Sequence, residues 1–351
     1  LLSRAANLSF IVPEGLFKTR SYSGCVEEIE KNGYIKSIAT FTNYVFENTI
    51  TGNLIFVFIN NKKGPTLNYN FDEELEIGTV EQKGTSILRQ IESETKPLST
   101  VAYLFKGMVV KDRDLVVSNN SKGKNDVFLL GKNISKWSIE SKFYANYEDL
   151  EIIGGTKKLE KHNHYPRILI RRTGDTLCCA YLNEKALTES TLYSCWSISA
   201  KISNKYLIGL LNSKLLDYYS KSLFITNQQA FPQILMTDLE LLPIKIANTD
   251  FLSKFVKLID YILYSKYSFI ERLIDTMVYK LYFPNQIRAA DADVLKHLND
   301  LPELKEDWTD EKKLKVIEEV YKKLSDPNHP VSIAMAKMDT IEEIRIIEGK
   351  Q

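Results

Sequence analysis

The hydrophobic pattern of the chain changes its period near residue 247, and this change restricts the fold more than any other feature. From about residue 98 to residue 245, short apolar runs such as TVAYLF, DVFLLG and PRILIRR alternate with polar turns. Such runs are typical of β-strands. The segments after LLPIKI have the spacing of amphipathic helices, for example FLSKFVKLIDYILY and TDEKKLKVIEEVYKKLSD, and Thr309 is the expected N-cap of the second. Inside the β-rich region, NKYLIGLLNSKLLDYYSKSLF also has helical spacing and predicts one helical segment. We therefore expect a β-rich domain followed by a helical tail.

The first sixty residues have a different pattern, in which a strand, a helix and two further strands follow one another. LSFIVP is a short apolar run that ends in proline, and the helical segment after it stops at Gly33. YIKSIATF and NLIFVFI are the next apolar runs. This order is typical of the last part of an α/β sheet. The turn-rich and acidic stretch that follows indicates a linker.

The sequence thus predicts a mixed α+β chain in four parts. These are the end of an α/β domain, a linker, a β-rich domain with inserted helices and a helical C-terminal region, at 1–62, 63–97, 98–246 and 247–351. The chain begins at Leu1, not at methionine, and reaches an apolar strand almost at once. We expect it to be a piece of a longer polypeptide.

Composition excludes some classes of protein and leaves others open. The formal net charge of the 351 residues is +1, so any electrostatic attraction to a partner must be local. No apolar run approaches the ~20 residues of a membrane span, and no signal peptide is visible. The four cysteines lack the spacing of a zinc site and indicate reduced, buried thiols. We therefore expect a cytoplasmic protein without a membrane partner.

Positive charge gathers in two segments of the predicted β-rich domain. Residues 106–136 hold seven basic and three acidic residues, and residues 157–172 hold six basic residues and one acidic residue. Segments of this kind can bind phosphates. Arginine can also bind the O6 and N7 atoms of guanine with two hydrogen bonds. From these segments we predict DNA contacts by Lys111, Arg113, Lys122, Lys124, Arg167, Arg171 and Arg172.

The segment TNQQAF adds three amide side chains, at Asn227, Gln228 and Gln229. Amides of this kind can pair with adenine in a major groove, so we predict base contacts there. Ordinary explanations remain open for both sets. Lysine-rich loops are usually only solvated, amides are common in turns, and one of two adjacent arginines can turn inward to pair with an acid.

The sequence shows no legible catalytic, cofactor-binding or metal-binding group. It contains no phosphate-binding glycine loop, nucleophile elbow or HExxH segment. The four histidines, His162, His164, His297 and His329, are too dispersed for a convincing metal site. We therefore predict no catalytic residue and no metal in this chain.

Two stretches carry a resemblance to a known family. LSFIVPEGLFKTRSYSGCVEEIEKNGYIKSIATF with VFENTITGNLIFVFI resembles the last third of the catalytic domain of N6-adenine DNA methyltransferases. YPRILIRR, LIGLLNSKLLDYY and FPQILMTDLELLPI resemble the TaqI-like C-terminal specificity domain of those enzymes. HPVSIAMAKMDTIEEIRIIEGK is similar to the tail of large fused restriction–modification polypeptides. The resemblance is strongest over 8–60 and 164–350.

The resemblance implies a parent enzyme that flips an adenine out of DNA and methylates its exocyclic nitrogen with S-adenosylmethionine. It implies double-stranded DNA as partner and a methyltransferase domain upstream, with or without a nuclease domain. The family's Asn/Asp-Pro-Pro-Tyr/Phe signature is absent, since no two prolines are adjacent. We therefore expect this chain alone to be inactive. The alternative is a non-catalytic specificity subunit that acts with a separate methylase chain.

Overall fold

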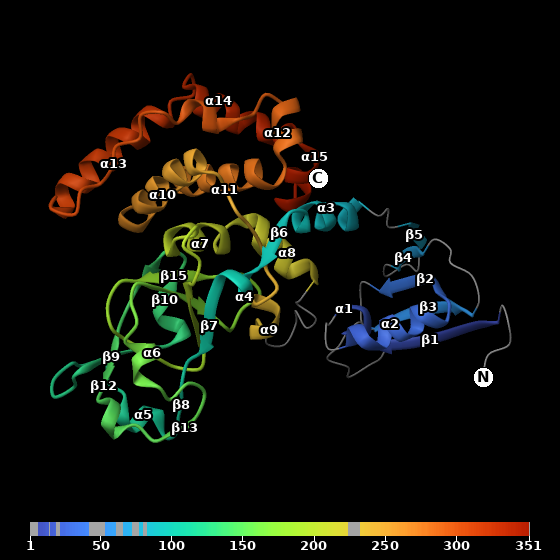
Figure 1. Cartoon of the computed structure of the whole chain (residues 1–351), viewed down its shortest axis with the longest axis horizontal. Coiled ribbons are helices and arrows are strands. Elements are labelled where there is room, and N and C mark those ends of the chain that lie inside the picture. Colours follow the sequence, from blue (N-terminus) through green and yellow to red (C-terminus); the bar gives the residue numbers. More distant parts are fainter. Residues whose placement is uncertain are drawn as a thin grey trace. The chain divides into compact units, whose positions relative to one another are not determined.

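A computed structural model describes the residues 6–13, 15–18, 22–41, 53–60, 66–71, 77–79, 83–223 and 232–350 (Figure 1). The chain divides into two compact units, and each is considered by itself. The first unit comprises 1–89 and 221–233, and the second comprises 90–220 and 234–351. Helix α3 (Lys83–Glu92) crosses the boundary between them in the sequence.

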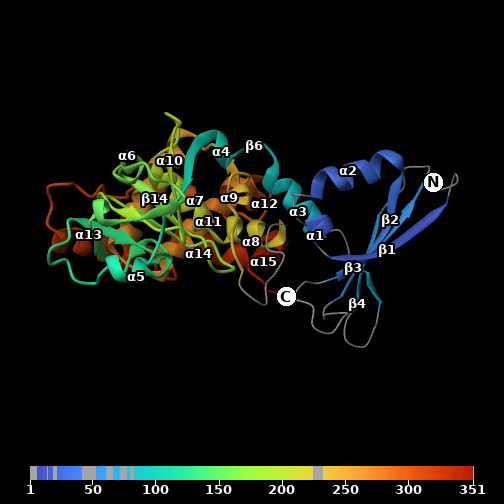
Figure 2. The ribbon, with the colours of Figure 1, turned by 90° about the horizontal axis from the view of Figure 1, so that it is seen from below.

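The first unit is built on one mixed sheet with the strand order β1-β3-β2-β4-β5. β3 is antiparallel to both β1 and β2, whereas β2 and β4 are parallel. Two helices accompany the sheet, and α2 covers one of its faces (Figure 2). The elements are β1 (Asn7–Pro13), α1 (Gly15–Lys18), α2 (Ser23–Asn32), β2 (Tyr34–Phe41), β3 (Asn53–Ile59), β4 (Leu67–Phe71) and β5 (Ile77–Thr79).

The predicted order of strand, helix, strand and strand is confirmed, and the apolar pattern explains it. Leu54, Phe56 and Phe58 alternate along β3 and point into a core on which Val26 and Ile29 of α2 pack. A Cβ atom at Gly33 would lie 2.1 Å from the carbonyl oxygen of Ile59, so glycine is required where the helix ends against the sheet. β4 and β5 of this sheet lie in the segment predicted to be a linker.

The second unit contains the expected short strands, arranged in several small sheets. The largest has four strands in the order β15-β14-β17-β7, and β12-β9-β16 forms another. β10-β11, β13-β8 and β18-β6 are pairs. The strands are β6 (Thr95–Pro97), β7 (Ala102–Lys106), β8 (Val109–Val110), β9 (Asp126–Leu129), β10 (Ile134–Ser135), β11 (Ser138–Ile139), β12 (Phe143–Ala145), β13 (Ile152–Gly154), β14 (Arg167–Arg171), β15 (Cys179–Leu182), β16 (Leu187–Thr188), β17 (Leu192–Ser197) and β18 (Pro243–Lys245).

Short helices join these strands, and the helix α7 ends just before Asn212, which bonds to a neighbouring strand. The helices are α4 (Leu98–Val101), α5 (Arg113–Val116), α6 (Leu159–His162), α7 (Asn204–Leu211), α8 (Lys214–Leu223) and α9 (Met236–Leu239). The sequence predicted one helical segment where α7 and α8 lie. They are separated because the amide of Asn212 bonds to the backbone N–H and carbonyl of Cys179, at 2.8 and 2.9 Å.

The predicted helical tail is confirmed. α10 lies against α7 and packs on α11, and α13 and α14 lie on their outer side (Figure 1). Thr309 caps α13 as predicted, since its hydroxyl accepts a hydrogen bond from the N–H of Lys312 at 3.3 Å. The helices are α10 (Thr249–Tyr264), α11 (Ser268–Tyr282), α12 (Pro284–Ala289), α13 (Asp310–Leu324), α14 (Pro330–Lys337) and α15 (Glu342–Ile347).

Candidate nucleic-acid interface

Arg167 lies at the start of β14 and is fully buried. Its guanidinium donates hydrogen bonds to the backbone carbonyls of His162 and His164, both at 2.5 Å, and of Ala186 at 2.6 Å. Burial lowers the pKa of Arg167 to about 10, which leaves it charged at neutral pH. The prediction that Arg167 contacts DNA is wrong, because the side chain is fully buried and its two terminal nitrogens bond to backbone carbonyls inside the protein.

Arg171 and Arg172, at the other end of the same strand, are partly buried. Arg171 donates from Nε to the carbonyl of Gly131 at 3.0 Å and from its second terminal nitrogen to the carbonyl of Ile134. The side chain of Arg172 is hydrogen-bonded to Tyr193. Both arginines therefore support neighbouring loops, and their contact with DNA stays a prediction.

The other predicted cations gather at one end of the second unit, which we call the loop end and define as residues 111–124 and 146–158. The two segments are held together by their backbones and amides: the Asn146 side chain donates to the carbonyl of Gly123 at 3.3 Å and accepts from the N–H of Asn125 at 2.9 Å. Tyr147 donates to the carbonyl of Lys157 at 2.6 Å. The structure thus brings together residues that are far apart in the sequence.

Carboxylates accompany most cations at the loop end. Lys111 pairs with Glu151 at 3.0 Å, Arg113 with Asp114 at 2.9 Å, and Lys124 with Asp149 at 3.6 Å. Lys122 is exposed in the loop between them. The loop end is therefore a surface of both signs, although the segment 106–136 carries an excess of basic residues. Exposed pairs are worth only ~0–1 kcal/mol, so phosphates or base edges can replace these carboxylates.

Asn227, Gln228 and Gln229 lie outside the described residues, so their predicted base contacts stay predictions.

Sequence analysis missed a second surface, which we call the aromatic–cation face and define as Tyr103, Lys161, His164 and Trp196. Tyr103 of β7 and Trp196 of β17 are cross-strand partners, and their ring centroids are 4.7 Å apart. The His164 ring stacks on Trp196 at 4.1 Å, and Lys161 lies 4.8 Å from the Tyr103 ring. The available signal was one aromatic residue in each strand, at positions that are half-buried in the structure, together with the basic segment 157–172.

The other histidine of this segment has a structural role. His162 is buried, and its ring nitrogens bond to the carbonyl of Thr156 at 2.9 Å and to the hydroxyl of Thr188 at 3.1 Å. Burial lowers the pKa of His162 to about 4, so it is neutral at neutral pH. Within the described parts of the chain, His, Cys, Asp and Glu side chains form no group of three or more that could hold a metal ion.

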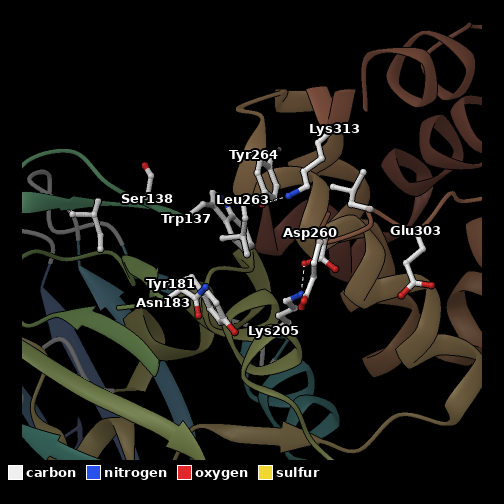
Figure 3. A pocket seen from close by; sticks show the side chains of 13 residues that line it. Trp137, Ser138, Tyr181, Asn183, Lys205, Asp260, Leu263, Tyr264, Glu303 and Lys313 are labelled. Atoms are coloured by element: carbon white, nitrogen blue, oxygen red, sulfur yellow. Dashed lines mark hydrogen bonds and ion pairs between the residues drawn. The ribbon is translucent and has the colours of Figure 1, made fainter. Parts of the chain in front are cut away.

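A cavity of about 740 Å³ lies between the β structure and the helical tail (Figure 3). Trp137, Tyr181 and Tyr264 contribute rings to its wall. Its charged groups include the ion pair of Lys205 with Asp260, at 2.5 Å, and acidic residues of the segment 303–306. Lys313 also lines the cavity, so its lining carries both signs of charge, and none of the residues predicted to contact DNA belongs to it. In the described part of the chain no helix is long and apolar enough to cross a membrane.

Comparison with known proteins identifies the class of this domain. The family model of the TaqI-like C-terminal specificity domain matches residues 126–244, which run from the start of β9 into β18. These residues form a DNA target-recognition domain of the kind found in restriction–modification enzymes. No curated protein matches the chain at a significant level.

Comparison with solved structures gives several matches of low sequence identity. The chain is similar to the type IIL restriction–modification enzyme MmeI in complex with DNA, with 12% identity and a TM-score of 0.50, over 98% of this chain and 50% of MmeI. The type IIG restriction endonuclease BpuSI matches with 10% identity and a TM-score of 0.40, over 95% of this chain and 48% of BpuSI. A type I specificity subunit from M. genitalium has 12% identity and a TM-score of 0.33, over 58% of this chain and 44% of that chain. This chain spans about half the length of MmeI and BpuSI.

Proposed function

We propose that this chain is the DNA-recognition part of a site-specific adenine-N6 DNA methyltransferase that belongs to a restriction–modification system. The match of the specificity-domain family to residues 126–244 carries this proposal. The mixed sheet of the first unit supports it, because β1, α2, β2 and β3 follow the order that resembles the end of an adenine methyltransferase domain. The similarity to MmeI, whose structure contains DNA, is consistent with it at the level of the fold.

The chain would act together with a methyltransferase domain encoded upstream, with or without a nuclease domain. The parent enzyme would use S-adenosylmethionine as methyl donor. The residues of this chain do not fit that cofactor, because its sequence has neither adjacent prolines nor the glycine-rich loop that would hold it. We therefore assign to the chain only DNA recognition, in a cytoplasmic enzyme, and derive no step of methyl transfer from it.

A non-catalytic specificity subunit that works with a separate methylase chain is the alternative. The first unit argues against it. A sheet of five strands precedes the specificity domain, and such a subunit has no use for the end of a methyltransferase sheet. A single polypeptide that contains both the methyltransferase domain and the specificity domain would explain the five-stranded sheet of the first unit.

Two surfaces of the second unit are suited to double-stranded DNA. The loop end presents cations and carboxylates on exposed loops, and this mixture suits base edges, since lysine and arginine bind guanine and carboxylates accept from cytosine N4. Lysines such as Lys122 would bind phosphates and fix the position of the duplex. The aromatic–cation face adds Lys161 beside the half-buried ring of Tyr103.

Binding of the full chain to duplex DNA tests this proposal. We expect a dissociation constant that rises steeply with salt, and enrichment of one sequence from a pool of randomised duplexes, measured by sequencing of the bound fraction. We also expect no methyl transfer from labelled S-adenosylmethionine by this chain alone. Binding that is independent of salt and sequence would contradict DNA recognition. Methyl transfer by the isolated chain would contradict the assignment of catalysis to a separate domain.

A further inference from the structure

The aromatic–cation face is a layered stack of rings on a rigid base. His164 stacks on Trp196 with an interplanar angle of 27°, and Trp196 contacts Tyr103 at an angle of 38°. Beneath them the buried ring of Phe105 lies edge-on to Trp196, with centroids 5.8 Å apart. Because Phe105 supplies the core contact, the outer rings are not needed to fill the interior.

The outermost ring of this stack faces water in apolar surroundings. His164 is exposed, and the neighbouring Tyr165 is 48% exposed. Ile198, two residues beyond Trp196 in the chain, is 59% exposed. Tyr103, Trp196 and His164 therefore form a connected set of rings whose outermost member is open to solvent, and a set of this kind is typical of a surface that meets a partner.

The charges around the stack indicate an anionic partner. Lys157, Lys158 and Lys161 precede His164, and Glu160 is the acid among the described residues 157–166. Lys161 donates to the hydroxyl of Tyr103, which fixes its ammonium group beside the rings. Partial burial and the charge of Arg167 lower the pKa of His164, so its ring is a neutral stacking surface at neutral pH. A flat neutral ring on a stack that also carries one fixed ammonium group matches a nucleobase joined to its phosphate.

We propose that the aromatic–cation face binds an unstacked nucleobase, with the His164 ring as the stacking surface and Lys161 beside the phosphate. The inference rests on the proposed function and names a second DNA-binding site outside the loop end. An unstacked base can come from a single strand or from a base displaced out of a duplex. Stacking of this kind tolerates any base and requires no sequence contact.

Fluorescence anisotropy with the full chain tests this inference on four labelled DNA probes of one sequence. They are a paired duplex, the same duplex with one unpaired adenine, the same duplex with an abasic site in place of that adenine, and one single strand. We expect the unpaired adenine to strengthen binding over the abasic probe by about 5- to 150-fold. The abasic probe has the same flexibility and lacks only the base. The single strand shows whether the face prefers a free strand to a displaced base.

Substitutions at His164 assign the effect to the stack. His164→Ala is expected to remove the preference for the unpaired adenine, and His164→Phe to retain it, because phenylalanine keeps the ring. His297→Ala removes an exposed histidine of the helical tail and is expected to change nothing. Equal affinity of the native chain for the adenine and abasic probes, or an unchanged preference in His164→Ala, would overturn the inference. If the native chain bound none of the probes, the proposed function itself would fail.

Discussion

The two basic segments of the sequence, 106–136 and 157–172, place their cations in opposite surroundings. Arg167 of the second segment is fully buried and is held by three backbone carbonyls. Lys111 and Lys124 of the first segment lie at the surface, where each faces one carboxylate. A buried guanidinium must satisfy its donors within the protein, whereas an exposed ammonium can exchange a carboxylate for a phosphate. Density of positive charge therefore does not by itself identify a DNA contact.

The largest expected effect concerns the buried member of this comparison. Arg167→Ala leaves the carbonyls of His162, His164 and Ala186 without their donor. Each buried acceptor that loses its partner costs ~1–3 kcal/mol, so we expect the free energy of unfolding to fall by about 3 kcal/mol or more. Equilibrium unfolding in urea, followed by circular dichroism, measures this loss.

Arg113→Ala is the matched control, since Arg113 is bonded to the adjacent and exposed Asp114. We expect its effect on the free energy of unfolding to stay within ~1 kcal/mol. Similar losses in the two variants would show that the buried and exposed cations do not differ in the way that the structure indicates.

Asp275 of α11 is a second buried ionisable group, and the pH dependence of stability tests how burial acts on it. Its carboxylate accepts the N–H of Lys214 at 2.9 Å, and burial raises its pKa from the ordinary 3.8 to about 7. Because the folded state binds this proton more tightly than the unfolded state, the stabilisation is complete below pH 4 and is lost as the pH rises to 7.

Asp275→Asn keeps the acceptor oxygen and removes the titration. We expect the difference in melting temperature between the variant and the native chain to grow in favour of the variant from pH 5 to pH 7. Scanning calorimetry across this range measures it. A difference that does not depend on pH would show that Asp275 is ionised over the whole range in the folded protein.

The smallest expected effect concerns an exposed cation of the loop end. Lys122→Ala removes one ammonium group from the loop between β8 and β9. We expect the free energy of unfolding to change by less than ~0.5 kcal/mol. If Lys122 binds a phosphate, the slope of log Kd against log salt becomes shallower by about 1. Lys315→Ala, at an exposed position of α13, should leave the slope unchanged. An equal change in both variants would place Lys122 outside the DNA surface.

Much of the fold could be predicted from local sequence patterns. β1, β2 and β3 coincide with their apolar runs, α2 ends at Gly33, and Thr309 caps α13 as expected. The division of one predicted helix into α7 and α8 could not be predicted, because Asn212 bonds to the backbone of Cys179 in a distant strand. Periodicity reports only contacts within one element.

The candidate site was less predictable than the fold. Residue type indicated the basic segments, but it could not show that Arg167 turns inward or that acids accompany Lys111 and Lys124. The pairing of Trp196 with Tyr103 depends on the register between β17 and β7, which are about ninety residues apart in the chain. No local pattern encodes a contact of that range.

The sequence by itself determined the class of the chain, because periodicity, glycine and proline positions and the specificity-domain segments are local properties. The tertiary structure alone decided which polar groups face water. Burial of a charge depends on whether distant carbonyls converge on it, as those of the segment 162–164 and of Ala186 converge on Arg167. The same packing left His164 and Trp196 stacked at the surface. The cost of removing a polar group from water depends on the partners around it, and only the folded chain brings those partners together.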